Sequence, residues 1–259
     1  MDTIVVAVRA SAELQEDFEL VDNDTQVDTD YLDIVLSDWD AAAVDAASQL
    51  ANEVIVVSVG GDEAETVLRE ALALGATQAI RITANVDADD PLSIAKLLSA
   101  YLAQHTPDLA LCGVQSGDHG GSAVPAAVAG YLGWPRSAVV NRVEESPNDD
   151  TLVEVARELE AGVTEISTLR LPAVISVQTG QYEHKHPSFM AKRKAATAEI
   201  RVLTGSDLGV ESGALQQARG TQRIRFRVPP RSATGEKLTG RPIEVAQQIL
   251  SIVNERLNP

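Results

Sequence analysis

The stretch PDLALCGVQSGDHGGSAVPAAVAGYLGWP, residues 107–135, guides the interpretation of the whole chain. An apolar run at 109–114 leads into a loop of small residues, 115–122, and then into apolar residues spaced three or four apart. This order predicts a buried strand, a loop and a helix. A helix that begins after such a loop presents free backbone N–H groups, which favour an anion. The stretch therefore predicts a phosphate-binding turn, with an ordinary turn between strand and helix as the alternative.

Five residues of the loop and the following helix have expected roles in this turn. Gly117, Gly120 and Gly121 lack a Cβ atom, so the backbone can come close to a ligand there. Ser122 is expected to cap the helix, because serine oxygens accept from free N–H groups at helix starts. Pro125 falls in the first turn, where a missing N–H group has little consequence.

Outward from this stretch, apolar β-branched segments alternate with helical patterns. Strands are expected at residues 3–8, 31–36, 54–59 and 79–82, and helices at 37–50, 63–74 and 91–104. The expected helix boundaries are Ser37 or Asp38, Asp62, and Asp89 or Asp90 as caps, and Gly75 as a stop. The alternation predicts an α/β fold with a doubly wound, mostly parallel sheet, Rossmann-like and of the adenine-nucleotide-binding type. Ligands bind such sheets at the carboxyl ends of the strands, where the strand order reverses.

Beyond Pro135 the pattern changes to strand-like segments at residues 137–143, 152–157, 166–171 and 173–177, which predict a β extension. From Thr204 on, the apolar pattern weakens, which indicates an arm of little independent stability. The arm ends in a predicted amphipathic helix, Pro242–Leu257, with an apolar face formed by Val245, Ile249, Ile252 and Val253. We therefore assign residues 1–203 to an α/β nucleotide-binding domain and residues 204–259 to an arm and helix that wrap onto a partner subunit.

Composition limits the partners and the location of the chain. A net charge of −17 repels phosphate, so nucleic acid is not an expected partner. The acidic composition is of the kind found in proteins of a high-salt cytoplasm. No apolar run reaches the ~18 residues of a membrane span, and the N-terminus does not resemble a signal peptide, so a cytoplasmic, non-embedded protein is expected. The one cysteine, Cys112, is expected to be a buried small side chain.

Basic residues are concentrated in the last third of the chain, in contrast to the acidic remainder. Such asymmetry favours a docking surface for an acidic partner. Local charge balance is the alternative.

Several segments, in their order and spacing, resemble the beta subunit of electron transfer flavoprotein over nearly the whole chain. They are VAVR at 6–9, EVIVVSVGG at 53–61, REALALGAT at 69–77, DPLSIAKLL at 90–98, the stretch 107–135, ARELEAG and LRLPAVISV within 156–177, MAKRK at 190–194 and GSDLGV at 205–210. The resemblance implies an electron carrier, not an enzyme, that pairs with an alpha subunit and completes its FAD site. It also implies AMP in this chain, or a second FAD if the carrier is of the electron-bifurcating type. The electrons would come from soluble dehydrogenases and pass to a membrane quinone reductase.

Carried over residue by residue, the resemblance implies a nucleotide pocket formed by four turns, without a catalytic acid or base and without a metal. Its residues are Ala7, Ser37, Asp38, Trp39, Asp40, Val59, Val114, Gln115, Ser116, Gly117, Asp118, His119, Gly120, Gly121, Ser122, Ala123, Val124 and Pro125. Backbone N–H groups at 120–124 would meet phosphate. Two other classes remain open: a stress-type nucleotide-binding module, and a nucleotide-hydrolysing or adenylating enzyme. Neither class accounts for the arm or for the segment MAKRK.

Overall fold

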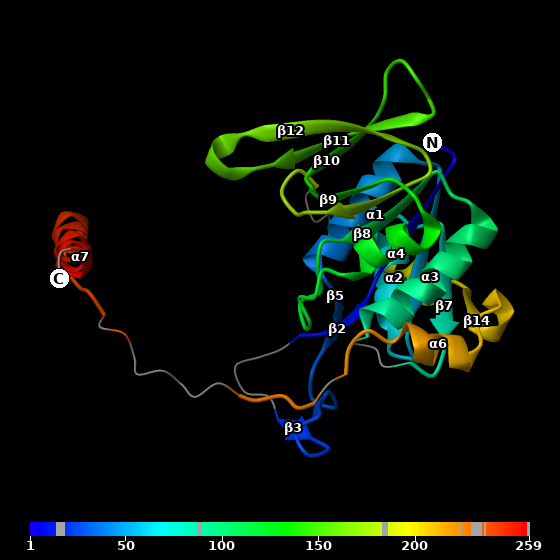
Figure 1. Cartoon of the computed structure of the whole chain (residues 1–259), viewed down its shortest axis with the longest axis horizontal. Coiled ribbons are helices and arrows are strands. Elements are labelled where there is room, and N and C mark those ends of the chain that lie inside the picture. Colours follow the sequence, from blue (N-terminus) through cyan, green and yellow to red (C-terminus); the bar gives the residue numbers. More distant parts are fainter. Residues whose placement is uncertain are drawn as a thin grey trace.

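A seven-stranded parallel sheet forms the centre of the computed structural model, which describes residues 1–13, 19–86, 90–182, 186–222, 224–228, 235 and 237–257. The strand order is β14-β7-β6-β1-β8-β13-β9 (Figure 1). Their bounds are Thr3–Ala7 (β1), Glu53–Val59 (β6), Gln78–Thr83 (β7), Leu109–Gly113 (β8), Arg136–Val140 (β9), Ala173–Val177 (β13) and Ile200–Thr204 (β14). The expected doubly wound α/β sheet is confirmed.

Helices cover both faces of this sheet, which explains why its central strands are almost continuously apolar. Side chains alternate across β1: Ile4 and Val6 enter one apolar cluster, and Val5 enters the other. The first cluster includes α1 and α2, and the second includes α3 and α4. The helix bounds are Asp38–Leu50 (α1), Ala64–Leu74 (α2), Pro91–His105 (α3), Val124–Leu132 (α4), Phe189–Ala196 (α5), Ser212–Ala218 (α6) and Pro242–Leu257 (α7).

The expected helix boundaries are mostly confirmed. Ser37 accepts a hydrogen bond from the Asp40 N–H at the start of α1, and Asp90 accepts one from the Ser93 N–H at the start of α3. Gly75 ends α2 with a φ of +135°. The expected cap at Asp62 is wrong, because α2 follows Glu63 without a side-chain cap and the Asp62 carboxylate pairs with an arginine instead. The other candidate for α3, Asp89, lies outside the described residues.

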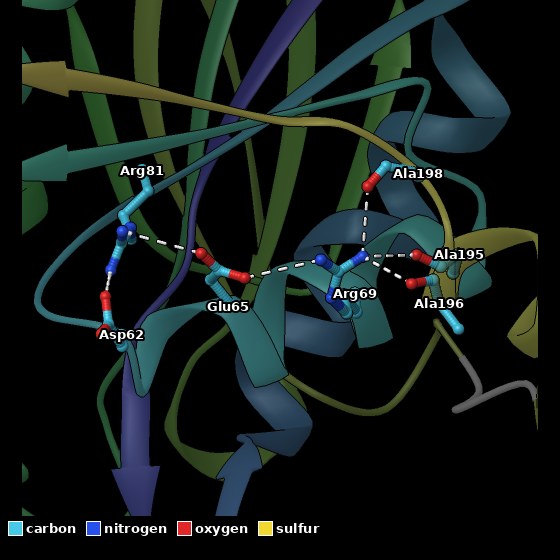
Figure 2. A network of polar contacts seen from close by, with 7 residues as sticks. All are labelled: Asp62, Glu65, Arg69, Arg81, Ala195, Ala196 and Ala198. Atoms are coloured by element: carbon cyan, nitrogen blue, oxygen red, sulfur yellow. Dashed lines mark hydrogen bonds and ion pairs between the residues drawn. The ribbon is translucent and has the colours of Figure 1, made fainter.

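An ion-pair network accounts for this different role of Asp62 (Figure 2). Arg81 of β7 contacts the carboxylates of Asp62 and Glu65, and Glu65 also contacts Arg69. Arg69 in turn donates from one nitrogen, over 3.0–3.1 Å, to the carbonyls of Ala195, Ala196 and Ala198. A cation at these carbonyls stabilises the C-terminus of α5, so the network holds α5 against α2.

The β extension divides into two parts. The expected strand at 137–143 divides at Asn141 into two strands that belong to different sheets. Just before this division Val139 has a φ of +60°, rare for a β-branched residue, and the pairing with β13 shifts in register there. β9 stays in the main sheet, and β10 (Arg142–Glu145) begins a separate antiparallel sheet of order β10-β11-β12. The other two strands are β11 (Leu152–Glu158) and β12 (Thr164–Arg170).

The segment between β1 and α1 is an excursion, as expected, with short strands in it. β2 (Ala10–Ala12) pairs with β5 (Ile34–Leu36), and β3 (Leu20–Val21) pairs with β4 (Gln26–Val27). The strand expected at 31–36 is therefore shorter than predicted and lies outside the main sheet.

The C-terminal segment has one part that packs on the sheet domain and one that does not. Leu208, Val210 and Leu215 are buried in the cluster around α3, so residues up to α6 belong to the packed body. The helix predicted at the end of the chain is confirmed as α7, which lies apart from the other elements (Figure 1). None of the described α7 residues is buried, and the side chain of Ile249 is 50% exposed. The predicted burial of its apolar face is thus not provided by this chain.

Candidate functional site

A cleft lies at the carboxyl ends of β1 and β8, where the strand order reverses. The chain runs from β1 to β6 and β7 on one side, and then returns to place β8 on the other side of β1. The space between the lining residues of the cleft is about 780 Å³, a volume that includes open solvent. This place suits a small-molecule ligand of a doubly wound sheet.

Most of the predicted pocket residues line this cleft. They are Ala7, Asp40, Val59, Val114, Gln115, Ser116, His119, Gly121, Ser122, Ala123, Val124 and Pro125. The other predicted residues do not line it: Ser37, Asp38 and Trp39 at the start of α1, and Gly117, Asp118 and Gly120 in the loop. Ser37 and Asp118 act on the cleft indirectly, through contacts with Asp40 and Arg9.

Several lining residues were missed by the sequence interpretation: Val8, Arg9, Pro91, Ile94, Leu98, Cys112 and Gly113. Three of them form a wall contributed by α3, whose apolar stripe continues past the sheet edge into the cleft. A signal was present for Arg9, which is a charged residue directly after a buried strand. No local signal marks the α3 wall, because it depends on where the helix packs.

The start of α4 supplies backbone donors to the cleft. The first N–H group with a carbonyl partner inside the helix is that of Ala127, which donates to Ala123. The N–H groups of Val124 and Ala126 belong to the first turn of the helix, where no preceding helical carbonyl is available to accept from them. Pro125 has no N–H group. The expected cap at Ser122 is wrong: its φ is +50°, and α4 follows Ala123 without a side-chain cap. An anionic ligand would therefore fit these donors.

Asp40 joins the ends of the two central strands beneath the cleft. Its carboxylate accepts from the Arg9 N–H after β1 and from the Gly113 N–H at the end of β8, each at 3.0 Å. A Cβ at Gly113 would lie 2.5 Å from the Asp40 carboxylate and 2.9 Å from the Trp39 carbonyl carbon, so the approach requires glycine. Burial raises the pKa of Asp40 to about 6, against the opposing effect of these hydrogen bonds.

An ion pair holds the loop after β8 over the cleft. The Arg9 guanidinium contacts both carboxylate oxygens of Asp118, with nitrogen–oxygen distances of 2.9–3.2 Å. Burial would raise the pKa of Asp118, but the bonds from Arg9 outweigh that effect and the pKa is lowered. The loop carboxylate therefore stays ionised and paired, and its charge is neutralised next to the N-terminus of α4.

Comparison with known proteins connects this geometry to a family. A family model described as the electron transfer flavoprotein domain matches residues 24–208. The electron transfer flavoprotein subunit beta of Methylophilus methylotrophus is 32% identical over 259 residues, 97% of this chain and 98% of that protein. The chain belongs to the electron transfer flavoprotein beta-subunit family. The resemblance drawn from the motifs is confirmed.

Further electron transfer flavoprotein beta subunits are similar over most of their length. That of Bacillus subtilis is 30% identical over 88% of this chain and 89% of its own. That of Syntrophomonas wolfei is 30% identical over 92% of this chain and 90% of its own. The loop at 115–122 and the cleft residues other than Ala7, Val8 and Arg9 lie within the region that the family model matches.

Three further properties of this beta-subunit chain bear on its chemistry. Within its described residues, no helix combines the length and apolarity needed to cross a membrane. In the same part of the chain, no three His, Cys, Asp or Glu side chains lie close enough together to hold a metal ion. Cys112 is buried as expected, and burial raises the pKa of its thiol to about 12, so the side chain is a neutral thiol.

Asp40 is expected to make the free energy of unfolding depend on pH. The folded pKa of about 6 exceeds the ordinary aspartate pKa of 3.8, so the folded chain binds more protons than the unfolded chain between these two pH values. The stabilisation that this raised pKa gives to the folded chain is fully present below the unfolded pKa and is lost as the pH rises through the folded pKa. The free energy of unfolding therefore falls by at most about 3 kcal/mol across this range. Denaturant unfolding of the native chain and Asp40→Asn between pH 4 and 7 checks this. If the difference in free energy of unfolding between the two proteins stays constant with pH, the predicted role of Asp40 is wrong.

Proposed function

We propose that this chain is the beta half of a heterodimeric electron carrier in the cytoplasm. An alpha subunit would hold most of an FAD, and this chain would complete that site and bind AMP in its own cleft. Electrons would arrive from soluble dehydrogenases and leave to a membrane quinone reductase. The acidic composition fits a surface solvated in high salt. Family membership supports the carrier role, and the stress-type module and the nucleotide-hydrolysing enzyme are disfavoured by it.

The observation that carries the AMP proposal is the start of α4, where Val124 and Pro125 line the cleft and the first backbone N–H groups precede the carbonyl partners of the helix. Phosphate suits these donors, because a helix N-terminus combines unpaired N–H groups with a favourable dipole. Apolar side chains of Val59, Ile94 and Leu98 line the same cleft and suit the faces of an adenine ring. Arg9 keeps the Asp118 carboxylate from opposing the phosphate charge.

The chain's own residues are suited to positioning and do not supply proton transfer. The Asp40 carboxylate is nine-tenths buried or more and is engaged by two backbone N–H groups, so it holds the strand ends together. The flavin would supply the one-electron chemistry. This chain would orient the carrier's nucleotide, shield the cleft from water and provide α7 for the partner.

Purification of the chain together with its alpha subunit tests the proposal. After denaturation, the released small molecules are identified by mass spectrometry and absorbance. One FAD and one AMP per heterodimer are the expected result. Two FAD molecules would indicate the electron-bifurcating type, and a complex without flavin would contradict the carrier role. The chain expressed alone is expected to be yellow weakly or not at all.

Gly121→Val is expected to remove the bound nucleotide. Gly121 lines the cleft, and a Cβ there already lies 2.9 Å from the His119 ring, so a valine must push into the cleft or displace that ring. Gly117→Val is the matched control in the same loop, since a Cβ at Gly117 meets nothing within 4 Å and Gly117 does not line the cleft. Nucleotide content is measured by mass spectrometry. Equal AMP content in both variants would contradict the proposed position of the phosphate.

A further inference from the structure

The N-terminus of α3 contacts the cleft and the root of the C-terminal arm at the same time. Pro91 and Ile94, in the first turns of α3, line the cleft. Asp90, directly before them, is 1% exposed and receives the backbone N–H groups of Gly220 and Thr221, after α6. Further along the chain, α7 lies apart from the sheet domain (Figure 1). We call residues 219–221 the arm root.

The two carboxylate oxygens of Asp90 have separate partners. Oδ2 accepts from the N–H and the hydroxyl of Ser93, and so caps α3. Oδ1 accepts from the Gly220 N–H at 3.0 Å, and from the Thr221 N–H and hydroxyl at 3.2 Å each. One buried carboxylate therefore holds the helix start with one oxygen and the arm root with the other.

Side-chain packing supports the same junction. A Cβ at Gly220 would lie 2.4 Å from a methyl carbon of Leu92, so the arm root lies directly against the first turn of α3. Leu215 of α6 is buried in the cluster that includes Leu97 and Leu98, and its carbonyl lies 3.1 Å from the Ser93 hydroxyl. If the arm root left Asp90, this buried carboxylate would lose the three hydrogen bonds on Oδ1 and keep only the two on Oδ2.

We propose that Asp90 is a positioning residue that couples the arm to the cleft. With the arm root bound, the first turn of α3 is fixed and the cleft wall formed by Pro91 and Ile94 is in place. With the arm root released, that turn loosens and the cleft loses affinity for its nucleotide. The coupling is reciprocal: a nucleotide that binds the completed wall stabilises the bound arm root, and hence the arm that leads to α7. The nucleotide half of this proposal rests on the proposed function.

The test uses the full chain, AMP as the probe, and hydrogen exchange measured by mass spectrometry. Asp90→Asn replaces one acceptor oxygen by an amide that cannot accept from these donors. The expected results are faster exchange at residues 216–222, faster exchange at residues 92–98, and an AMP affinity weakened by about fivefold or more, the lower end of typical couplings. In the native chain, AMP is expected to slow exchange at the arm root, which a purely structural helix cap would not produce.

Two further variants separate the arm contact from the cap and from general effects of the substitution. Thr221→Val removes only a hydroxyl on the Oδ1 side, and is expected to reproduce a smaller part of both effects while the cap stays intact. It carries the test if Asp90→Asn does not fold. Asp149→Asn is the matched control: Asp149 accepts from the N–H and hydroxyl of Thr151 in the turn between β10 and β11, away from α3, and should leave both measurements unchanged.

The failures of the two proposals are distinguishable. If the native chain binds no AMP, the proposed nucleotide is wrong, and exchange at residues 92–98 alone decides the coupling. Faster exchange at residues 216–222 without any change at 92–98 would overturn the coupling. Release of the arm root with an unchanged AMP affinity would overturn it as well.

Discussion

Gly113→Ala is expected to lower the free energy of unfolding by about 3 kcal/mol or more, the upper range for overpacking a well-packed site. The added Cβ would lie 2.5 Å from the Asp40 carboxylate, 2.8 Å from the Asp40 backbone nitrogen and 2.9 Å from the Trp39 carbonyl carbon. Two of these atoms are backbone at the start of α1, so the helix start would have to move away from β8. That movement would also break the hydrogen bond from the Gly113 N–H to Asp40.

Gly130→Ala is the matched control for this substitution. Gly130 lies in α4, the helix whose first residues line the same cleft, and a Cβ there meets nothing within 4 Å. Alanine has the higher helix propensity, so this variant should gain up to about 1 kcal/mol. Urea unfolding followed by circular dichroism measures both. A Gly113→Ala variant as stable as the native chain would show that α1 does not need to approach β8 so closely.

Removal of residues 223–259 is expected to abolish assembly with the alpha subunit while leaving the sheet domain folded. None of the described α7 residues is buried, whereas Leu208, Val210 and Leu215 before it are buried in the sheet domain. Ile249, Ile252 and Val253 are 42–50% exposed and lie on one face of α7. An apolar helical face without a partner in its own chain is suited to a groove on another protein.

Co-expression of the two subunits followed by size-exclusion chromatography measures this assembly. The truncated chain should elute alone with a native circular dichroism spectrum. Ile249→Asp should weaken assembly by placing a charge on the apolar face, whereas Gln248→Asp, one position away, should not. Co-elution of the truncated chain with the alpha subunit, or its failure to fold, would show that α7 has another role.

Much of the fold could be predicted because it depends on local patterns. The strands at 54–59 and 109–114 are continuous apolar runs, and runs of this kind are buried on both faces of a parallel sheet. The caps Ser37 and Asp90 are each one of two candidates that the sequence offers, because capping depends on a few neighbouring residues. The loop at 115–122 could be predicted to border the cleft, because an apolar run, small residues and a helical pattern follow one another along the chain.

Other features are absent from local patterns. β14 was not predicted, because only Leu203 of this edge strand is buried and its alternation is incomplete. Asp62 is a residue type that favours helix caps, but its carboxylate forms an ion pair with Arg81 of β7 instead. The irregularity at Val139 within β9 has no sequence signal, since valine is among the residues least suited to a positive φ.

By itself, the sequence determined the class of sheet, the positions of its buried central strands along the chain, the family, and the loop that borders the cleft, since periodicity and small residues act over a few neighbouring positions. Only the tertiary structure decided that α3 forms a cleft wall, that Asp40 joins β1 to β8, and that Asp90 holds both α3 and the arm root. These contacts connect residues that are far apart in sequence, as in the hydrogen bond that the Gly220 N–H donates to the Asp90 carboxylate. Which distant polar group satisfies a buried carboxylate is settled by packing, and no local pattern contains that information.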